Sequence, residues 1–338
     1  MPRICVYGAG SIGCYVGGRL AAADADVVLV GRQRVRDDVA GGLHLTDYRG
    51  ADVRATPEFV LDTDGAAAAE GADLVLVTVK SAATPEVAEI LGRALRPDAV
   101  VVSLQNGLRN ADLLRAALPG RTVLTGMVPF NVVNLGGGAF HQGSEGGLEV
   151  QDDPAVTPYE AVFARAGLPL TRRADMDAVL RAKLLLNLNN AVNALSGLPL
   201  KAELSQRTYR RCLALAQREA YATFRAAGWA VARITPLPPG WIPRLLVMPD
   251  RLYATVAGPT LAIDPLARSS MWEDLEAGRV TEIEWINGEV VRLAETLGRT
   301  APVNARLVAL VRAAEAGGPR AWSGDDLLAD LRAAAAQP

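Results

Sequence analysis

Short runs of Val, Leu and Ile alternate with helix-period windows along the first half of the chain. Five of these runs are apolar at most positions: residues 3–7, 26–32, 73–80, 99–107 and 121–128. Such runs are typical of strands that are buried on both faces of a parallel sheet. Windows with apolar residues at helical spacing, such as 11–23 and 83–95, lie between them. This order predicts a doubly wound α/β domain.

Glycine-rich and short elements follow at the end of this first domain. Glycine density rises over residues 134–147, which predicts a hairpin or a loop before one more strand at 147–150. A helical window at 157–167 and a short segment at 168–172 come next. We therefore expect the first domain to span residues 1–172.

The second half contains helix-period windows and no convincing strand. The windows cover residues 175–196, 203–227, 266–297 and 302–316. Prolines at 235–244 forbid a continuous helix there and predict a structured loop. The predicted fold class is thus α/β, with a doubly wound parallel sheet followed by an all-α domain at 173–316 and a peripheral tail at 317–338.

Composition narrows the range of partners. The chain has 338 residues, of which 21% are charged, and its net charge is −2. This balance gives no general attraction to nucleic acid or to an anionic membrane. No apolar run approaches the ~20 residues that span a bilayer, and a strand pattern at Arg3 leaves no room for a signal peptide. We expect a cytoplasmic protein with neither nucleic acid nor membrane as partner.

Cysteine and histidine are too scarce for most metal or histidine chemistry. Cys5, Cys14 and Cys212 show no metal-ligand spacing, and packing is the simplest explanation for them. His44 and His141 are the only histidines. We expect no metal site, and we expect acid–base chemistry to fall to a lysine or a carboxylate.

A glycine-rich loop follows the first predicted strand and opens a helix. Gly8, Gly10 and Gly13 form G-x-G-x-x-G, with Ala9, Ser11 and Ile12 between them. In a dinucleotide-binding loop, the first glycine permits the turn, the second lets pyrophosphate approach the backbone, and the third lets helix and strand pack. The alternative is a glycine-rich turn without a nucleotide. Its place between strand and helix favours a Rossmann-type dinucleotide site.

The charge that follows the second strand favours one cofactor. An NAD site usually places an acid about twenty residues after the loop, whereas Arg32 stands here, with Arg34 and Arg36 behind it. Arg32 suits a 2′-phosphate, so we predict NADP(H). Lys80 and Asn106 end later strands and should lie near the cofactor. They could instead be a helix-entry charge and a turn residue.

A lysine and several asparagines interrupt a run of leucines in RAKLLLNLNNAVNALSG, residues 181–197. At about 100° per residue, Lys183, Asn187 and Asn190 form one stripe, and Asn193 lies at its edge. The stripe could be an ordinary solvated face. Amides that donate and accept also suit a ligand, however, and Lys183 could protonate a carbonyl oxygen as hydride arrives.

Two serines and an acid stand out in the segment 267–291. Ser269 and Ser270 could cap a helix or contact a ligand, and capping is the simpler assumption. Glu282 borders an apolar face, where a carboxylate is costly without a partner. Lys183 or a substrate hydroxyl is a reasonable partner for it.

Together these motifs resemble the ketopantoate reductase family, the 2-dehydropantoate 2-reductases. The resemblance rests on GAGSIG at 8–13, LVTVK ending at Lys80, QNG at 105–107, RAKLLLN at 181–187 and SSMWEDLEAGRVTEIEWING at 269–288. It covers nearly the whole chain. It implies an N-terminal Rossmann-type domain, a helical second domain, and NADPH-dependent reduction of a 2-oxo acid in pantothenate biosynthesis.

The resemblance also implies roles for single residues. Lys183 matches the general acid and Glu282 the acid that holds the substrate hydroxyl. Arg32 matches the 2′-phosphate arginine, while Lys80 and Asn106 match residues near the nicotinamide and its ribose. The predicted substrate contacts are Asn106, Asn187, Asn190, Asn193 and Ser270.

Two departures leave the identity of the 2-oxo acid open. The family commonly carries a second asparagine four residues after the first, whereas Ala191 stands here and Asn193 lies two residues later. Ala267 replaces an asparagine often found three residues before Ser270. The oligomeric state also stays open, with a homodimer as one option.

Two other functions remain as alternatives. A lysine-dependent 3-hydroxyacid dehydrogenase also pairs a Rossmann domain with a lysine four residues before an asparagine, although the 269–288 motif argues against it. A catalytically silent NADPH-binding sensor would need the glycine loop but neither Lys183 nor Glu282.

Overall fold

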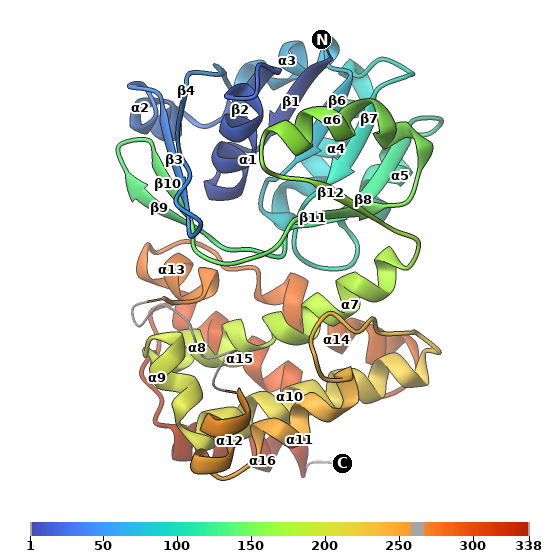
Figure 1. Cartoon of the computed structure of the whole chain (residues 1–338). Coiled ribbons are helices and arrows are strands. Elements are labelled where there is room, and N and C mark those ends of the chain that lie inside the picture. The colour runs from blue at the N-terminus through green and yellow to red at the C-terminus, as the bar shows by residue number, and fades with distance from the viewer. Residues whose placement is uncertain (1, 258–266, 337–338) are drawn as a thin grey trace. The chain divides into compact units, whose positions relative to one another are not determined.

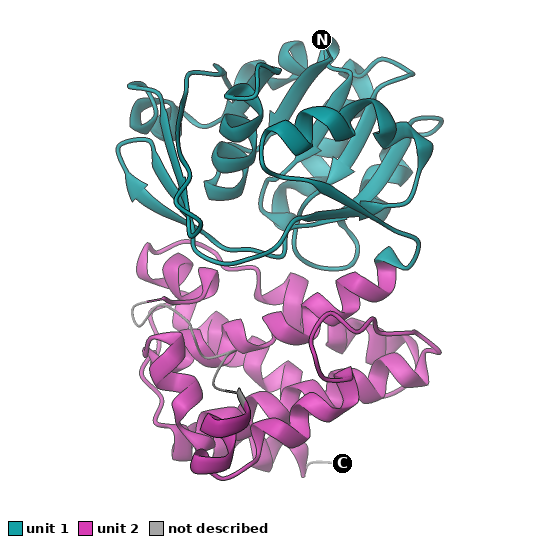
Figure 2. Ribbon diagram, viewed as in Figure 1, with its two compact units in different colours: residues 1–176 teal, residues 177–338 magenta. Residues whose placement is uncertain are grey.

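The chain folds into two compact units. A computed structural model describes residues 2–257 and 267–336. Unit 1 is Met1–Met176 and unit 2 is Asp177–Pro338 (Figure 2). The sequence placed the boundary slightly earlier, after residue 172.

An eight-stranded sheet forms the centre of unit 1, in the order β12-β11-β8-β7-β6-β1-β2-β5 (Figure 1). Its strands are β1 Arg3–Tyr7, β2 Asp26–Gly31, β5 Glu58–Leu61, β6 Leu74–Val77, β7 Val100–Ser103, β8 Thr122–Met127, β11 Leu148–Gln151 and β12 Leu170–Arg173. Neighbouring strands from β5 to β8 are parallel, and β11 pairs antiparallel with β8. The five apolar runs are confirmed as strands; β1 matches its run, and the other four strands are shorter than predicted.

Helices cover both faces of this sheet, as the predicted doubly wound fold requires. They are α1 Ser11–Ala21, α2 Gln33–Asp38, α3 Gly65–Glu70, α4 Thr84–Ala94, α5 Asn110–Ala117 and α6 Thr157–Arg165. One apolar core packs α1 and α6 against the sheet, and a second packs α3, α4 and α5 against its other face. Because the central strands are buried on both faces, their sequences show no polar alternation.

A second, four-stranded sheet was not predicted. Its order is β4-β3-β10-β9, with β3 Leu43–Asp47, β4 Asp52–Ala55, β9 Val132–Gly136 and β10 Ala139–Gln142. The glycine-rich stretch does form a hairpin, β9 to β10, as expected. Strand β10 also pairs parallel with β3, far away in the sequence. Such a long-range pairing between short, partly exposed strands leaves little local signal.

Unit 2 contains helices and, among its described residues, no strand. Its α-helices are α7 Met176–Asn187, α8 Asn189–Ser196, α9 Leu200–Ser205, α10 Arg207–Ala226, α11 Ile242–Leu246, α12 Asp250–Ala257, α13 Ser270–Glu276, α14 Ile283–Thr296, α15 Pro302–Glu315 and α16 Gly324–Ala335. The first of these begins at the last residue of unit 1. The predicted all-α character of this half is confirmed.

Three of the predicted helical windows are divided. The window 175–196 breaks at Leu188, and the window 203–227 breaks at Gln206, whose backbone is extended. The window 266–297 was wrong as one helix, since α13 ends at Glu276 and Gly278 follows in the left-handed region with φ +60°. Glycine supplies that conformation without strain, so helical periodicity continues in the sequence where the helix itself stops.

The sequence also predicted a proline-rich loop and a peripheral tail in unit 2. The proline-rich stretch 235–244 is a loop that ends in a 3-10 turn and enters α11. The tail contributes α16, which buries Leu327, Leu328 and Leu331. The structure shows no helix, within its described residues, that is long and apolar enough to cross a membrane.

The three cysteines are free and fully buried. Cys5 belongs to the core beneath α3, α4 and α5, Cys14 to the core beneath α1 and α6, and Cys212 lies on α10. Burial raises the pKa of each thiol to about 12. Packing therefore accounts for these residues, as the sequence suggested.

Candidate functional site

The glycine loop connects β1 to α1 and is held over the end of β2. The backbone N–H groups of Gly8 and Ala9 both donate to the Val30 carbonyl, at 3.0 and 2.8 Å. Gly8 has φ +122°, and a Cβ there would lie 2.5 Å from the Val79 nitrogen. Only glycine can therefore occupy position 8 without moving the backbone.

The other two glycines of the motif differ from each other. A Cβ on Gly13 would lie 2.1 Å from the Gly8 carbonyl oxygen, so close packing of helix and strand requires glycine there. A Cβ on Gly10 would meet no atom within 4 Å, and its φ of −83° is ordinary. The fold does not require a glycine at position 10. The open space beside it suits the close approach of a ligand, such as a pyrophosphate, to the backbone.

Helix α1 adds donors to this space. The first N–H groups of an α-helix lack carbonyl partners within it, and the positive end of its dipole favours an anion. Ser11 begins α1 directly after Gly10, and the ladder starts with Cys14 N–H donating to the Gly10 carbonyl at 2.8 Å. The residues predicted to bind a dinucleotide thus have the backbone arrangement that such a ligand needs.

Arg32 lies immediately after β2, where a dinucleotide's adenosine ribose would be expected. Its backbone is extended, it precedes α2, and its side chain is exposed. The acids closest in sequence have other contacts, because Asp37 accepts a hydrogen bond from Gln33 and Asp38 accepts one from the Gly137 N–H. No described residue forms a hydrogen bond or ion pair with the Arg32 side chain. The guanidinium is therefore available to an anionic group.

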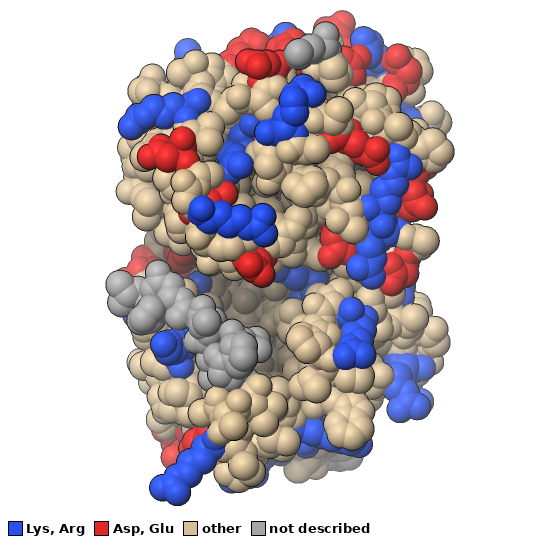
Figure 3. All heavy atoms as spheres, in the orientation of Figure 1, with Lys and Arg blue, Asp and Glu red and all other residues tan. Residues whose placement is uncertain are grey.

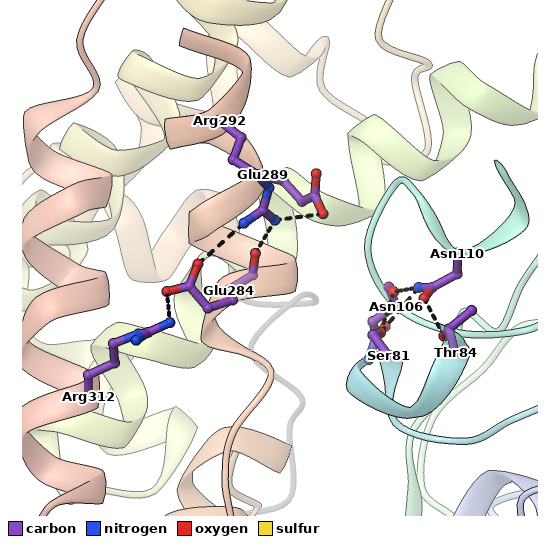
Figure 4. A network of polar contacts seen from close by, with 8 residues as sticks. All are labelled: Ser81, Thr84, Asn106, Asn110, Glu284, Glu289, Arg292 and Arg312. Atoms are coloured by element: carbon purple, nitrogen blue, oxygen red, sulfur yellow. Dashed lines mark hydrogen bonds and ion pairs between the residues drawn. The ribbon is translucent and has the colours of Figure 1, made fainter. Parts of the chain in front are cut away.

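A buried polar network joins the loops that follow β6 and β7 (Figure 4). Ser81 Oγ donates to the Asn106 carbonyl at 3.0 Å, and Asn110 Nδ2 donates to the same carbonyl at 2.6 Å. Thr84 Oγ1 donates to Asn110 Oδ1 at 2.7 Å, and Gln105 Nε2 donates to Thr84 Oγ1 at 2.7 Å. Two side chains, Ser81 and Asn110, therefore hold the carbonyl oxygen of Asn106.

The members of this network were missed at the sequence level. Each of Ser81, Thr84 and Asn110 is the buried first residue of a helix or 3-10 turn, where capping explains such a residue in a sequence, although none of the three caps its helix here. The two predicted residues of these loops, Lys80 and Asn106, each lie three residues after the end of β6 or β7, which are neighbouring strands of one sheet. A shared edge of a parallel sheet is where ligands bind in this fold.

In unit 2, Lys183, Asn187 and Asn190 are each partly exposed. The opposite side of the helical segment is buried, including Leu184 at 2% exposure and Leu188 and Val192 at 0%. Because α7 ends at Asn187 and α8 begins at Asn189, the stripe is split between two helices. Although Lys183 keeps some exposed surface, desolvation of its amine holds the pKa below that of an ordinary lysine.

Asn193, another predicted substrate contact, is fully buried at 0% exposure. Its Nδ2 donates to the Leu198 carbonyl at 3.0 Å and to Glu203 Oε2 at 2.9 Å, and its Oδ1 accepts from the Ser269 N–H at 3.0 Å. These contacts occupy both ends of the amide. Asn193 connects α8 to its neighbours, so its amide is not among the substrate contacts that we propose.

Ser269 and Ser270 are neighbours in sequence but differ in burial and in their contacts. Ser269 is buried and caps α13, since its Oγ accepts from the Trp272 N–H at 3.2 Å. Its Oγ also donates to the Asn190 carbonyl at 3.3 Å. Ser270 is the first residue of α13 and is exposed. The structure therefore brings the Ser270 backbone close to the stripe residue Asn190.

Glu282 is 9% exposed and stands directly before α14. The turn that carries it is held by two hydrogen bonds: Thr281 N–H donates to Glu315 Oε1 at 2.7 Å, and Ile283 N–H donates to Thr281 Oγ1 at 3.2 Å.

Ion pairs stabilise α14 beyond this turn. Arg292 pairs with Glu284 and Glu289 (Figure 4). Arg312 on α15 also pairs with Glu284, which connects the two helices.

Neither a broad patch of one charge, on the face drawn in Figure 3, nor a metal site is found within the described parts of units 1 and 2. Figure 3 shows basic and acidic side chains interspersed on the face drawn, without a broad patch of one sign. The described part of the chain gathers no three His, Cys, Asp or Glu side chains that could hold a metal ion.

Comparisons with known proteins cover both units. The profile described as "Ketopantoate reductase PanE/ApbA" matches residues 4–154, and "Ketopantoate reductase PanE/ApbA C terminal" matches residues 175–315. The 2-dehydropantoate 2-reductase of Halobacterium salinarum is 33% identical, over 94% of this chain and 100% of the relative.

Solved structures agree on the fold. A PanE/ApbA family ketopantoate reductase from Ralstonia eutropha is 31% identical with a TM-score of 0.78, and the match covers 93% of this chain and 99% of the other. D-mandelate dehydrogenase in complex with NADH and anilino(oxo)acetate has a TM-score of 0.77 over 93% of this chain and 99% of its own. At 20% identity it shares the fold alone.

Proposed function

The chain belongs to the ketopantoate reductase family, and from this premise we propose that it reduces a 2-oxo acid with NADPH. The proposed substrate is 2-dehydropantoate or a close analogue, which would place the reaction in pantothenate biosynthesis. The observation that carries the proposal is Lys183, a partly exposed lysine with a lowered pKa, one helical turn before Asn187. It stands in a chain whose first unit carries the G-x-G-x-x-G sequence between β1 and α1.

The proposed cofactor site consists of residues from unit 1. The loop Gly8–Gly13, with Ala9, Ser11 and Ile12, would hold the pyrophosphate against the start of α1. Arg32 would hold the 2′-phosphate through charge-assisted hydrogen bonds, which supports NADP(H) over NAD(H). Lys80 and Asn106 would contact the nicotinamide end. When bound, the cofactor supplies a hydride to C2 of the substrate.

The proposed chemistry of the protein is a proton transfer. Lys183 donates a proton from its ammonium group to the carbonyl oxygen of the 2-oxo acid, which becomes the hydroxyl of the product. Desolvation favours this step, because a lowered pKa makes the ammonium a stronger acid. Glu282 would orient the substrate hydroxyl, and Ser270, Asn187 and Asn190 would bind the polar groups of the acid.

A panel of 2-oxo acids assayed with NADPH and with NADH tests this function. We expect turnover of 2-dehydropantoate or a similar branched 2-oxo acid, with NADPH preferred. Oxidation of 3-hydroxy acids in place of this activity would favour the lysine-dependent 3-hydroxyacid dehydrogenase. Tight NADPH binding without turnover of any acid would favour a sensor and contradict the proposal.

We also propose a cytoplasmic location, since three free buried thiols suit a reducing compartment. Sedimentation would distinguish a monomer from the homodimer that the sequence left open.

A further inference from the structure

Glu203 is a fully buried acid of unit 2. It lies on α9 with 0% exposure. Its Oε2 accepts a hydrogen bond from Asn193 Nδ2 at 2.9 Å and another from Asn189 Nδ2 at 3.2 Å. Two asparagines of α8 therefore converge on one oxygen of a single carboxyl group.

Glu203, Asn189 and Asn193 form a buried polar cluster, and its remaining atoms point to a proton on the Glu203 carboxyl group. Glu203 Oε1 and Asn189 Oδ1 are both buried, and neither has a hydrogen-bond partner among the described residues. Both are acceptors, so an ionised carboxylate leaves both unsatisfied, whereas a protonated carboxyl group carries one donor. Burial raises the pKa of Glu203 to about 8, in agreement with a neutral acid at pH 7.

Among the described groups that shift the pKa of Glu203, none is a cation. Tyr209 and Cys212 on α10 and Tyr253 on α12 interact with it electrostatically, and burial raises the pKa of all three, which keeps them neutral. Arg210 on α10 is fully buried but donates to the Leu204, Leu246 and Met248 carbonyls and to Asp250. An ionised Glu203 would stand without a cation partner among the groups that set its pKa.

The cluster continues to the start of α13. Asn193 Oδ1 accepts from the Ser269 N–H, and Ser269 Oγ reaches the Asn190 carbonyl. Ser270 follows directly. Three successive contacts thus lead from Glu203 to residues of the proposed substrate site.

We propose that Glu203 is a positioning residue. As a neutral carboxylic acid it fixes Asn193, and Asn193 fixes the backbone at Ser269, which keeps Ser270 and Asn190 in place for the 2-oxo acid. This inference rests on the proposed function. Glu203 itself touches neither substrate nor cofactor.

The first test compares the pH dependence of KM for the 2-oxo acid in wild type, Glu203→Gln and Glu203→Ala. Above about pH 8 the wild-type KM should rise, by up to about tenfold per pH unit, as Glu203 loses its proton. Glu203→Gln offers an N–H donor group and a carbonyl acceptor at this position without titrating, so its KM should lack the rise that comes from Glu203. Glu203→Ala should raise KM about tenfold at every pH. The KM for NADPH should not change in either variant.

Glu295→Gln is the matched control, since it makes the same chemical change at an exposed position of α14. It should reproduce the wild-type KM profile. If Glu203 had a structural role only, Glu203→Gln would change the stability of the protein but would keep the rise of KM above about pH 8. Coincident KM profiles for wild type and Glu203→Gln would therefore overturn the proposal.

A second test needs no turnover. A carboxyl group whose pKa is higher in the folded than in the unfolded state loses its stabilising effect as pH rises through the folded value. The wild-type Tm should thus fall between about pH 4.5 and 8 relative to that of Glu203→Gln, and the difference should level off above pH 8. A Tm difference between wild type and Glu203→Gln that does not change with pH would contradict a protonated Glu203. An inactive wild type with the expected Tm profile would instead contradict the proposed function alone.

Discussion

Lys183 combines a reactive group with an environment that alters its acidity. Its neighbours Leu184 and Leu188 are buried, and the amine is desolvated. The sequence predicted the residue and its stripe, because amides among leucines are unusual on a solvated helix face. It could not predict that Asn193 would turn inward to Glu203, since that contact depends on how α9 packs against α8.

Replacement of Lys183 with alanine should lower turnover by ~100-fold or more, because general acid catalysis typically contributes factors of this size. NADPH binding should stay nearly intact, since the proposed cofactor contacts lie in unit 1. Steady-state kinetics and fluorescence titration with NADPH measure the two effects. Lys201→Ala, at an exposed lysine of α9, is the control and should leave both unchanged. Full turnover in the Lys183 variant would remove this residue from the mechanism.

Arg32 should determine the choice between the two nicotinamide cofactors. A charge-assisted hydrogen bond contributes about 1.5–3 kcal/mol, so Arg32→Ala should raise the KM for NADPH by about 10- to 100-fold. The KM for NADH should change little. Arg34→Ala, two residues later in α2 and also exposed, serves as comparison. An equal loss for both cofactors would mean that Arg32 does not read the 2′-phosphate.

At the scale of elements, the five strands buried on both faces were predictable, and the partly exposed strands β3, β4 and β5 were not. Strands β1, β2, β6, β7 and β8 are buried on both faces, so each leaves an uninterrupted apolar run. Strands β3, β4 and β5 are partly exposed, and β3 and β5 pair with β10 and β2, which lie far away in the sequence. Periodicity likewise could not show that the chain turns at Gly278 inside a continuous helical pattern.

The junction of β1 and α1 offers a matched pair of glycine variants. Gly10→Ala should fold normally, because its Cβ enters open space, yet it should weaken NADPH binding at least about tenfold by blocking the phosphate. Gly13→Ala should lower stability by roughly 1–3 kcal/mol, because its Cβ meets the Gly8 carbonyl. Thermal unfolding and NADPH titration separate the two effects. Unchanged NADPH affinity in Gly10→Ala would argue against a phosphate beside this glycine.

For the whole molecule, division into two units means that a ligand of one unit need not stabilise the other. Each unit has enough residues for its own core, and unfolding in two transitions is a reasonable expectation. The family profiles also divide the chain, with one match in each half.

NADPH should therefore raise the transition of unit 1. At a concentration of about 100 times Kd it contributes about 2.7 kcal/mol, which corresponds to roughly 5–10 °C for a unit of this size. Differential scanning calorimetry with and without NADPH measures the shift. NADH at the same concentration is the control and should give a smaller one. Equal shifts for both would speak against recognition of the 2′-phosphate.

The three buried thiols make the chain its own probe of local opening. Only the thiolate reacts with alkylating reagents, and burial keeps Cys5, Cys14 and Cys212 protonated and covered. Each becomes reactive only when its surroundings open, so its modification rate reports the free energy of that opening. Cys5 and Cys14 report on the two opposite helical layers of unit 1, and Cys212 reports on unit 2. Residue-by-residue alkylation read by mass spectrometry can thus compare the stability of the two layers of unit 1 with that of unit 2.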